Sequence, residues 1–132
     1  IVKYNTGGAQ QWIKQLGTSS CDQAYDVVTD SSGNVYATGY TNGGLDSNSN
    51  SGQTDVFLVK YNSSGTKQWT RQIGTSTDDV ALGLAIDNSS NIYIVGYSMG
   101  ELDGNANSGV AYAQDDAWDF FILKYDSNGN KQ

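Results

Sequence analysis

Hydrophobic positions along this chain recur in short alternating runs that are separated by segments rich in Gly, Asn and Ser. In the part from residue 24 to residue 74, the runs occupy residues 24–30, 34–41, 55–62 and 67–74. β-Branched and aromatic residues at this spacing are typical of strands, and the intervening "DSSGN" and "NSSGT" segments are typical of hairpin turns. The pattern therefore predicts a four-stranded antiparallel sheet in an all-β chain.

The pattern occurs more than once. Residues 3–52 align with residues 60–109 without a gap, so that Trp12 matches Trp69 and Gly39 matches Gly96. A third copy begins at residues 124–132, after a stretch in which residues 110–119 replace residues 53–55. Four-stranded sheets that recur along a chain predict the blades of a β-propeller.

Two quoted stretches carry a resemblance to a known family. "DSSGNVYATGYT" (30–41), followed by "DVFLVKYNSSGTKQWTRQIGT" (55–75), resembles the SBBP repeat, which is named for seven-bladed β-propellers. That family is found mainly in secreted or surface-attached bacterial and archaeal proteins. The resemblance implies a propeller and an extracellular or cell-surface location in a prokaryote, and it implies no particular reaction.

The predicted blades are too few to form a closed ring. We assign residues 1–23 to the end of a preceding blade, residues 24–74 to a first full blade, and residues 80–132 to a second blade that lacks its last strand and carries an insertion at 110–118. A propeller needs typically about 4 to 8 blades. We therefore expect an incomplete ring, either part of a longer repeat protein or a protomer of a head-to-tail oligomer or filament, in which segment 10–17 extends the edge of segment 119–125.

Charge and composition make several classes of partner and activity unexpected for this chain. The net charge of -7 repels phosphate, so nucleic acid is not an expected partner, and the absence of a long apolar run predicts no membrane span. The chain has no His, and Cys21 is its single Cys. Without the commonest general base near neutral pH, we expect no enzymatic activity, and with a single Cys we expect no internal disulfide.

The repeated loops "LDSNSNSG" (45–52) and "LDGNANSG" (102–109) place side-chain oxygens at alternate positions. Because Ca²⁺ is bound by carboxylate and carbonyl oxygens, calcium is the possible cofactor. The candidate ligands are Asp46, Asn48, Asn50, Asp55, Asp103, Asn105 and Asn107. The favoured alternative is a turn in which Asx side chains bond nearby amides, since the glycine and glutamate of an EF-hand are missing.

Four aspartates recur at the ends of the first predicted strand of each blade: Asp22, Asp30, Asp79 and Asp87. Paired carboxylates can act as acid and base, as in glycosidases. A catalytic pair is expected once per molecule, however, so the recurrence favours turn capping.

Aromatic residues recur on the outer two predicted strands: Tyr4, Trp12, Tyr61, Trp69 and Tyr125. They could stack on sugar rings, but packing between blades is the favoured interpretation. The least repetitive stretch, residues 110–121, adds Tyr112, Asp115, Asp116 and Trp118 as candidate ligand or partner contacts.

These features favour a non-enzymatic extracellular scaffold that acts in assembly or adhesion. Its expected partners are other copies, further repeats of the same chain, or a cell-surface glycan or protein. The first alternative is a carbohydrate-binding propeller, and the second is a substrate-binding part of a larger secreted enzyme.

Overall fold

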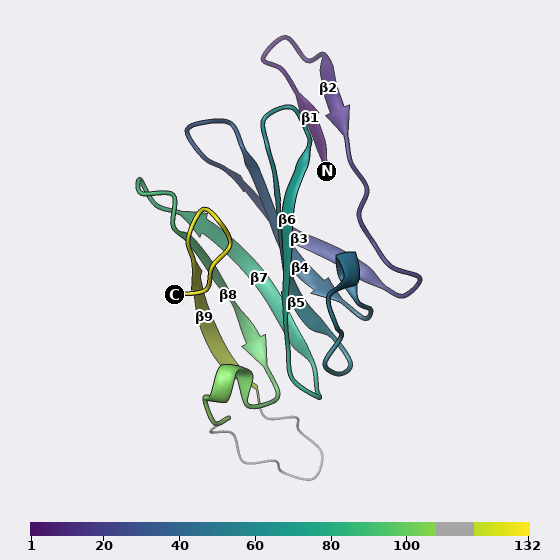
Figure 1. Cartoon of the computed structure of the whole chain (residues 1–132), viewed down its shortest axis with the longest axis vertical. Coiled ribbons are helices and arrows are strands. Elements are labelled where there is room, and N and C mark those ends of the chain that lie inside the picture. Colours follow the sequence, from purple (N-terminus) through teal and green to yellow (C-terminus); the bar gives the residue numbers. More distant parts are fainter. Residues whose placement is uncertain (108–117) are drawn as a thin grey trace.

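A computed structural model describes residues 1–107 and 118–132 of the chain. The described part is all-β and forms three antiparallel sheets that follow one another without closing a ring (Figure 1). Its strands are β1 (Val2–Tyr4), β2 (Gln10–Ile13), β3 (Asp22–Thr29), β4 (Val35–Thr41), β5 (Asp55–Tyr61), β6 (Lys67–Ile73), β7 (Asp79–Ile86), β8 (Ile92–Ser98) and β9 (Asp119–Tyr125). Two short 3₁₀ turns, η1 (Leu45–Ser47) and η2 (Leu102–Gly104), complete the elements. The expectation of incomplete propeller blades is confirmed.

The central sheet has four strands in the order β3-β4-β5-β6, as the hydrophobic pattern predicts. The two hairpin turns lie where the sequence places them, because Gly33 donates its amide to the Asp30 carbonyl and Gly65 donates its amide to the Asn62 carbonyl, both at 2.9 Å. Gly65 has a φ of 81°, a conformation that glycine adopts without strain. Each strand boundary lies within two residues of the expected one.

The sheets on either side have fewer strands. One contains β1 and β2 only, and the other contains β7, β8 and β9 in that order. A register shift in β3 between Ala24 and Asp26 recurs in β7 between Ala81 and Gly83, so the repeat extends to a β-bulge.

The hydrophobic core lies between the sheets. Because successive side chains of a strand point to opposite faces, β5 packs on both sides. Val56 and Leu58 face the third sheet and join one cluster, whereas Phe57, Val59 and Tyr61 form a second cluster on the opposite face. A strand buried on both faces reads as a continuous hydrophobic run, and this explains the sequence "DVFLVKY".

The recurring aromatic residues pack between the sheets with one exception. Trp12 lies 6.1 Å from Tyr61 and Trp69 lies 6.1 Å from Tyr36, measured between ring centroids. Tyr61 and Tyr125 are buried. The expectation is wrong for Tyr4, which is exposed on the small first sheet.

The recurring aspartates cap turns, as expected. Asp30 accepts hydrogen bonds from the Ser32 and Asn34 amides at 3.0 and 2.9 Å, and Asp87 repeats this arrangement. Burial opposes ionisation of Asp30, but hydrogen bonds from Asn34, Tyr36 and Ser32 outweigh it and hold the pKa of this carboxyl below its ordinary value. The carboxylate is therefore part of the folded turn.

Candidate functional site: the edge of the third sheet

Strand β9 has a paired neighbour on one side. It pairs with β8 along its whole length, whereas its other edge makes a single bridge in the described residues, between Tyr125 and Lys131. The equivalent strand β5 pairs with β4 on one edge and with β6 on the other. Unpaired backbone N–H and C=O groups on an edge strand are a template for another strand.

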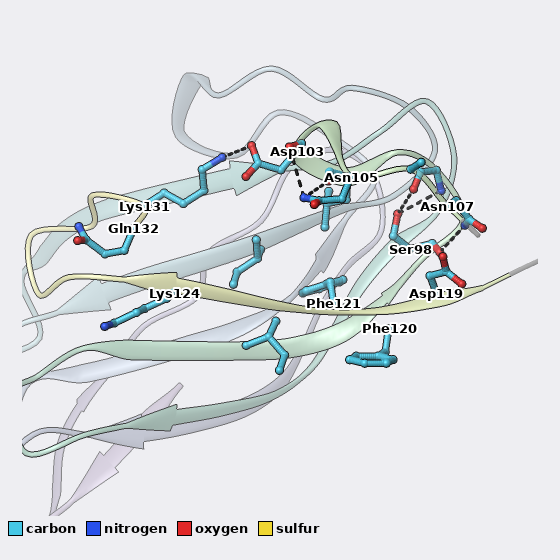
Figure 2. A pocket seen from close by; sticks show the side chains of 15 residues that line it. Ser98, Asp103, Asn105, Asn107, Asp119, Phe120, Phe121, Lys124, Lys131 and Gln132 are labelled. Atoms are coloured by element: carbon cyan, nitrogen blue, oxygen red, sulfur yellow. Dashed lines mark hydrogen bonds and ion pairs between the residues drawn. The ribbon is translucent and has the colours of Figure 1, made fainter. Parts of the chain in front are cut away.

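A groove of about 460 Å³ runs along this edge (Figure 2). Its walls come from β9, from η2 and from the residues that follow β9, and they include Gly100, Leu102, Asp103, Leu123 and Lys131. Figure 2 shows Lys131 pointing toward Asp103 above β9. The groove is open. It lies beside β9, in the position that β6 takes beside β5 in the central sheet.

The central sheet shows how a fourth strand is bonded at the equivalent edge. The Gln72 side chain of β6 donates to the Gly43 carbonyl and to Asp55, both at 3.0 Å, and accepts the Leu45 amide at 2.9 Å. Together these bonds join the fourth strand to the loop that contains η1. Gln72 matches Gln15 in the repeat, so its recurrence in "QWIKQLG" and "QWTRQIG" was the sequence signal for this missed residue.

The third sheet carries the counterparts of those partners. Gly100, Leu102 and Asp119 match Gly43, Leu45 and Asp55 in the repeat, and Gly100 and Leu102 line the groove together with Asp119. Along β9, no described residue takes the place of Gln72. The groove therefore repeats the positions that bind Gln72 in the central sheet, and here the Leu102 amide donates to the Gly100 carbonyl at 3.0 Å.

The outward face of the third sheet is also apolar. Phe120 is 83% exposed and Ile122 is 63% exposed, whereas their counterparts Val56 and Leu58 are 1% exposed because the third sheet covers them. Exposed apolar patches of this kind mark interaction surfaces. The next sheet of a propeller would cover the same positions.

Lysines at one position of the repeat reach the next sheet. Lys3 of β1 donates to the Ser63 carbonyl at 3.0 Å, and Lys60 of β5 donates to the Ser127 carbonyl at 2.8 Å. Ser63 lies in the turn after β5, and Ser127 lies in the turn after β9. Lys124 is the next lysine of this series, and its ammonium lies 5.5 Å from the centre of the Tyr93 ring.

In the first loop, the expected calcium ligands each make a hydrogen bond or an ion pair to another residue of the chain. Asp46, whose φ is 50°, pairs with Lys67 and accepts a hydrogen bond from Thr70. Asn48 donates to the Leu45 carbonyl at 2.6 Å. Burial opposes ionisation of Asp46, but the Lys67 and Thr70 hydrogen bonds and the charge of Lys67 lower the pKa of this carboxyl.

The remaining candidates behave in the same way. Asn50 accepts the Gly52 amide at 2.8 Å, and Asp103 pairs with Lys131. Asn105 donates to the Leu102 carbonyl at 3.3 Å, and Asn107 donates to the Ser98 carbonyl at 3.2 Å. Asp55 lies at the start of β5 and bonds back to the loop, since it accepts the Ser51 amide at 2.9 Å. Across residues 1–107 and 118–132, no three Asp, Glu, Cys or His side chains form a metal-binding group. Calcium binding in these loops stays a prediction.

Of the candidate contacts in the insertion, Tyr112, Asp115 and Asp116 lie outside the described residues. Trp118 is described, and its ring stacks on Tyr97 with a centroid distance of 4.2 Å and an interplanar angle of 23°. The Trp118 side chain is 53% exposed. One face of an aromatic pair is therefore accessible beside β9.

Comparison with known proteins agrees with the repeated sheets. The model of a family described as β-propeller repeat, SBBP, matches residues 11–46 and 68–103, which together make more than half of the chain. The chain belongs to the SBBP β-propeller repeat family. The two matches cover the same strands in successive copies, which agrees with the repeat seen in the sequence.

Two relatives are much longer than this SBBP chain. It is 25% identical to the regulatory protein FlaEY of Caulobacter vibrioides over 140 residues, which cover 100% of the chain and 14% of that protein. It is 29% identical to an uncharacterized WD repeat-containing protein of Acanthamoeba polyphaga mimivirus over 118 residues, which cover 76% of the chain and 8% of that protein. In the described part of the chain, no helix is long and apolar enough to cross a membrane.

Proposed function

We propose that this chain is a non-enzymatic scaffold module of an extracellular prokaryotic protein, and that it acts in assembly by accepting a fourth strand and a further blade at β9. The observation that carries the proposal is the groove along β9, which repeats the Gly, Leu and Asp positions that hold β6 in the central sheet. The exposed Phe120 and Ile122 supply a surface for the blade that follows. Family membership and the WD repeat relative support a role in protein interaction, and the SBBP resemblance supports the extracellular location.

The expected strand has a defined pattern. In the central sheet, Gln72 bonds the loop, Thr70 bonds Asp46, and Trp69 packs against the cluster between the sheets. A partner strand at β9 therefore needs Gln three residues after Trp, as in residues 67–74 of this chain. Backbone hydrogen bonds give such strand addition its affinity, and the side-chain pockets give it specificity.

A labelled peptide with the sequence of residues 67–75 tests the proposal by fluorescence anisotropy against the whole chain. We expect saturable binding that weakens when the position of Gln72 in the peptide is Ala, and weakens again in the chain variant Asp119→Ala. A scrambled peptide of the same composition is the control. Equal binding of the scrambled peptide, or no saturation, would rule out a strand-accepting groove.

Carbohydrate binding is the second candidate. The accessible stack of Trp118 on Tyr97 favours it, because flat aromatic faces can pack against sugar rings. Binding on a glycan array that disappears in Trp118→Ala, in a chain that does not bind the peptide at β9, would support this function in place of assembly.

A further inference from the structure

Two completely buried carboxylates lie where the central and third sheets meet. Asp55 begins β5 and Asp79 begins β7, and both side chains are 0% exposed. The Asp79 amide donates to the Thr54 carbonyl at 3.0 Å, and Thr54 forms a parallel bridge with Asp78. The two strands therefore start side by side, with one aspartate on each.

The two carboxyl groups contact the same peptide. A Cβ placed on Gly74 would lie 2.1 Å from Oδ1 of Asp55, and the Thr75 amide donates to Oδ2 of Asp79 at 2.5 Å. Burial raises the pKa of Asp79, the nearby Ser98 hydroxyl and the hydrogen bonds from Thr75 oppose this shift, and the nearby charge of Asp55 adds to it. The two carboxyl groups are thus close enough for the charge of Asp55 to raise the pKa of Asp79.

Each carboxylate leaves one oxygen without a partner. Oδ2 of Asp55 accepts the Ser51 amide at 2.9 Å and the Gln72 amide group at 3.0 Å, and Oδ2 of Asp79 accepts the Thr75 amide and hydroxyl. Oδ1 of both aspartates is buried and has no hydrogen bond. Within the described residues, the ion pairs belong to Asp46 and Asp103. A buried charge is costly unless it is paired, so this junction lacks a positive group.

We propose that Oδ1 of Asp55 and Oδ1 of Asp79 bind one divalent cation, Ca²⁺ in preference to Mg²⁺. Further oxygen ligands lie beside Asp79, since the Thr75 hydroxyl contacts its carboxylate and its amide contacts the hydroxyl and the carbonyl of Thr54. Ca²⁺ accepts carboxylate, hydroxyl and carbonyl oxygens in a flexible geometry. Bound there, the ion joins the central sheet to the third sheet.

The tight packing at this junction accounts for the preference. A Cβ on Gly52 would lie 2.3 Å from the Thr75 carbonyl oxygen, and a Cβ on Gly100 would lie 2.4 Å from the Thr75 hydroxyl. Mg²⁺ loses its water ligands reluctantly and needs near-octahedral geometry, whereas Ca²⁺ gives up water for protein oxygens more readily. A junction this close has little space for a hydrated ion.

The chain offers two matched controls. Asp22 takes the position of Asp79 in the preceding repeat, but its Oδ1 accepts the Thr41 hydroxyl at 2.5 Å and is satisfied. Asp46 belongs to the acidic loop and is occupied by Lys67. Variants at these two positions remove a carboxylate of the same kind without touching the proposed site.

Isothermal titration of the metal-free chain with CaCl₂ and with MgCl₂ tests the site. We expect one Ca²⁺ per chain, weaker Mg²⁺ binding, and a Ca²⁺-dependent rise in melting temperature, because a ligand of the folded state stabilises it. Asp55→Asn and Asp79→Asn should each weaken Ca²⁺ binding at least about tenfold, since charge count sets affinity. Asp22→Asn and Asp46→Asn should bind as the unaltered chain does.

A second measurement needs no variant. In ¹⁵N–¹H spectra of the unaltered chain, Ca²⁺ should shift the amides of Gly74, Thr75 and Ser98. Shifts confined to residues 46–50, or no binding of either ion, would overturn the proposal. An equal loss of Ca²⁺ binding in Asp22→Asn would do so as well. The outcome is independent of peptide binding at β9, so failure here leaves the assembly proposal intact.

Discussion

Leu58 and Ile122 occupy the same position in successive repeats, and only one of them is covered by a neighbouring sheet. Leu58 is 1% exposed in the cluster between the central and third sheets, whereas Ile122 is 63% exposed on β9. Truncating a buried Leu to Ala removes its transfer free energy and leaves a cavity, which costs about 2 to 5 kcal/mol. We therefore expect Leu58→Ala to lower the free energy of unfolding by about 3 kcal/mol, and Ile122→Ala to lower it by less than about 1 kcal/mol.

Urea unfolding followed by tryptophan fluorescence measures both values, provided that the slope m stays the same in each variant. A loss below about 1 kcal/mol in Leu58→Ala would refute the assignment of Leu58 to the core between the sheets. A large loss in Ile122→Ala that grows with protein concentration would show that association covers this face. The same loss at every concentration would contradict the exposed position of Ile122.

Two further predictions concern turns. Gly65→Ala should destabilise the fold by about 1 kcal/mol more than Gly8→Ala. Both glycines have a positive φ, but only a Cβ on Gly65 would meet the Trp12 ring, at 2.8 Å. Equal losses of stability in thermal unfolding would contradict this contact. The lowered pKa of Asp30 means that its carboxylate contributes stability above its unfolded pKa of about 3.8 and loses it as the pH falls through the folded value. Melting temperatures measured from pH 2 to 6 should therefore fall less steeply below pH 4 in Asp30→Asn than in the unaltered chain. In this variant the side-chain amide can cap the turn as Asn62 does. Parallel curves for the two chains would argue against a contribution of the Asp30 carboxylate.

The strands could be predicted from the sequence because local signals agree with one another. Alternation, β-branched residues and the Asx-Ser-Ser-Gly turns all delimit the same segments, and the repeat reproduces them in each copy. Tyr4 shows where this reasoning ends. Its counterparts Tyr61 and Tyr125 are buried because the preceding sheet packs against each of them, whereas no described sheet packs against Tyr4 in this way. Burial therefore depended on the neighbouring sheet, which the alternation does not encode.

The candidate site was less accessible to sequence reasoning, because its contacts join distant segments. Asp46 resembles a metal ligand within its own loop, yet its partners Lys67 and Thr70 come from β6, outside that loop. Asp79 caps a turn as expected, but its Oδ1 is buried without a hydrogen bond, and Asp55 of another sheet lies against the same peptide. Both findings needed the register between strands.

One carboxylate shows that the junctions between blades are not interchangeable. Asp26 sits beside the bulge of β3, where its Oδ1 accepts the Val27 amide and its Oδ2 accepts the Leu84 amide of β7, each at 2.7 Å. Val27 and Leu84 are the same position in successive repeats, so a single side chain satisfies both bulges. Gly83 takes the place of Asp26 in the next repeat and has no carboxylate to offer. A blade that packs after β9 must therefore satisfy its own bulge amide, and this requirement distinguishes the partner of the third sheet from the partner of the central one.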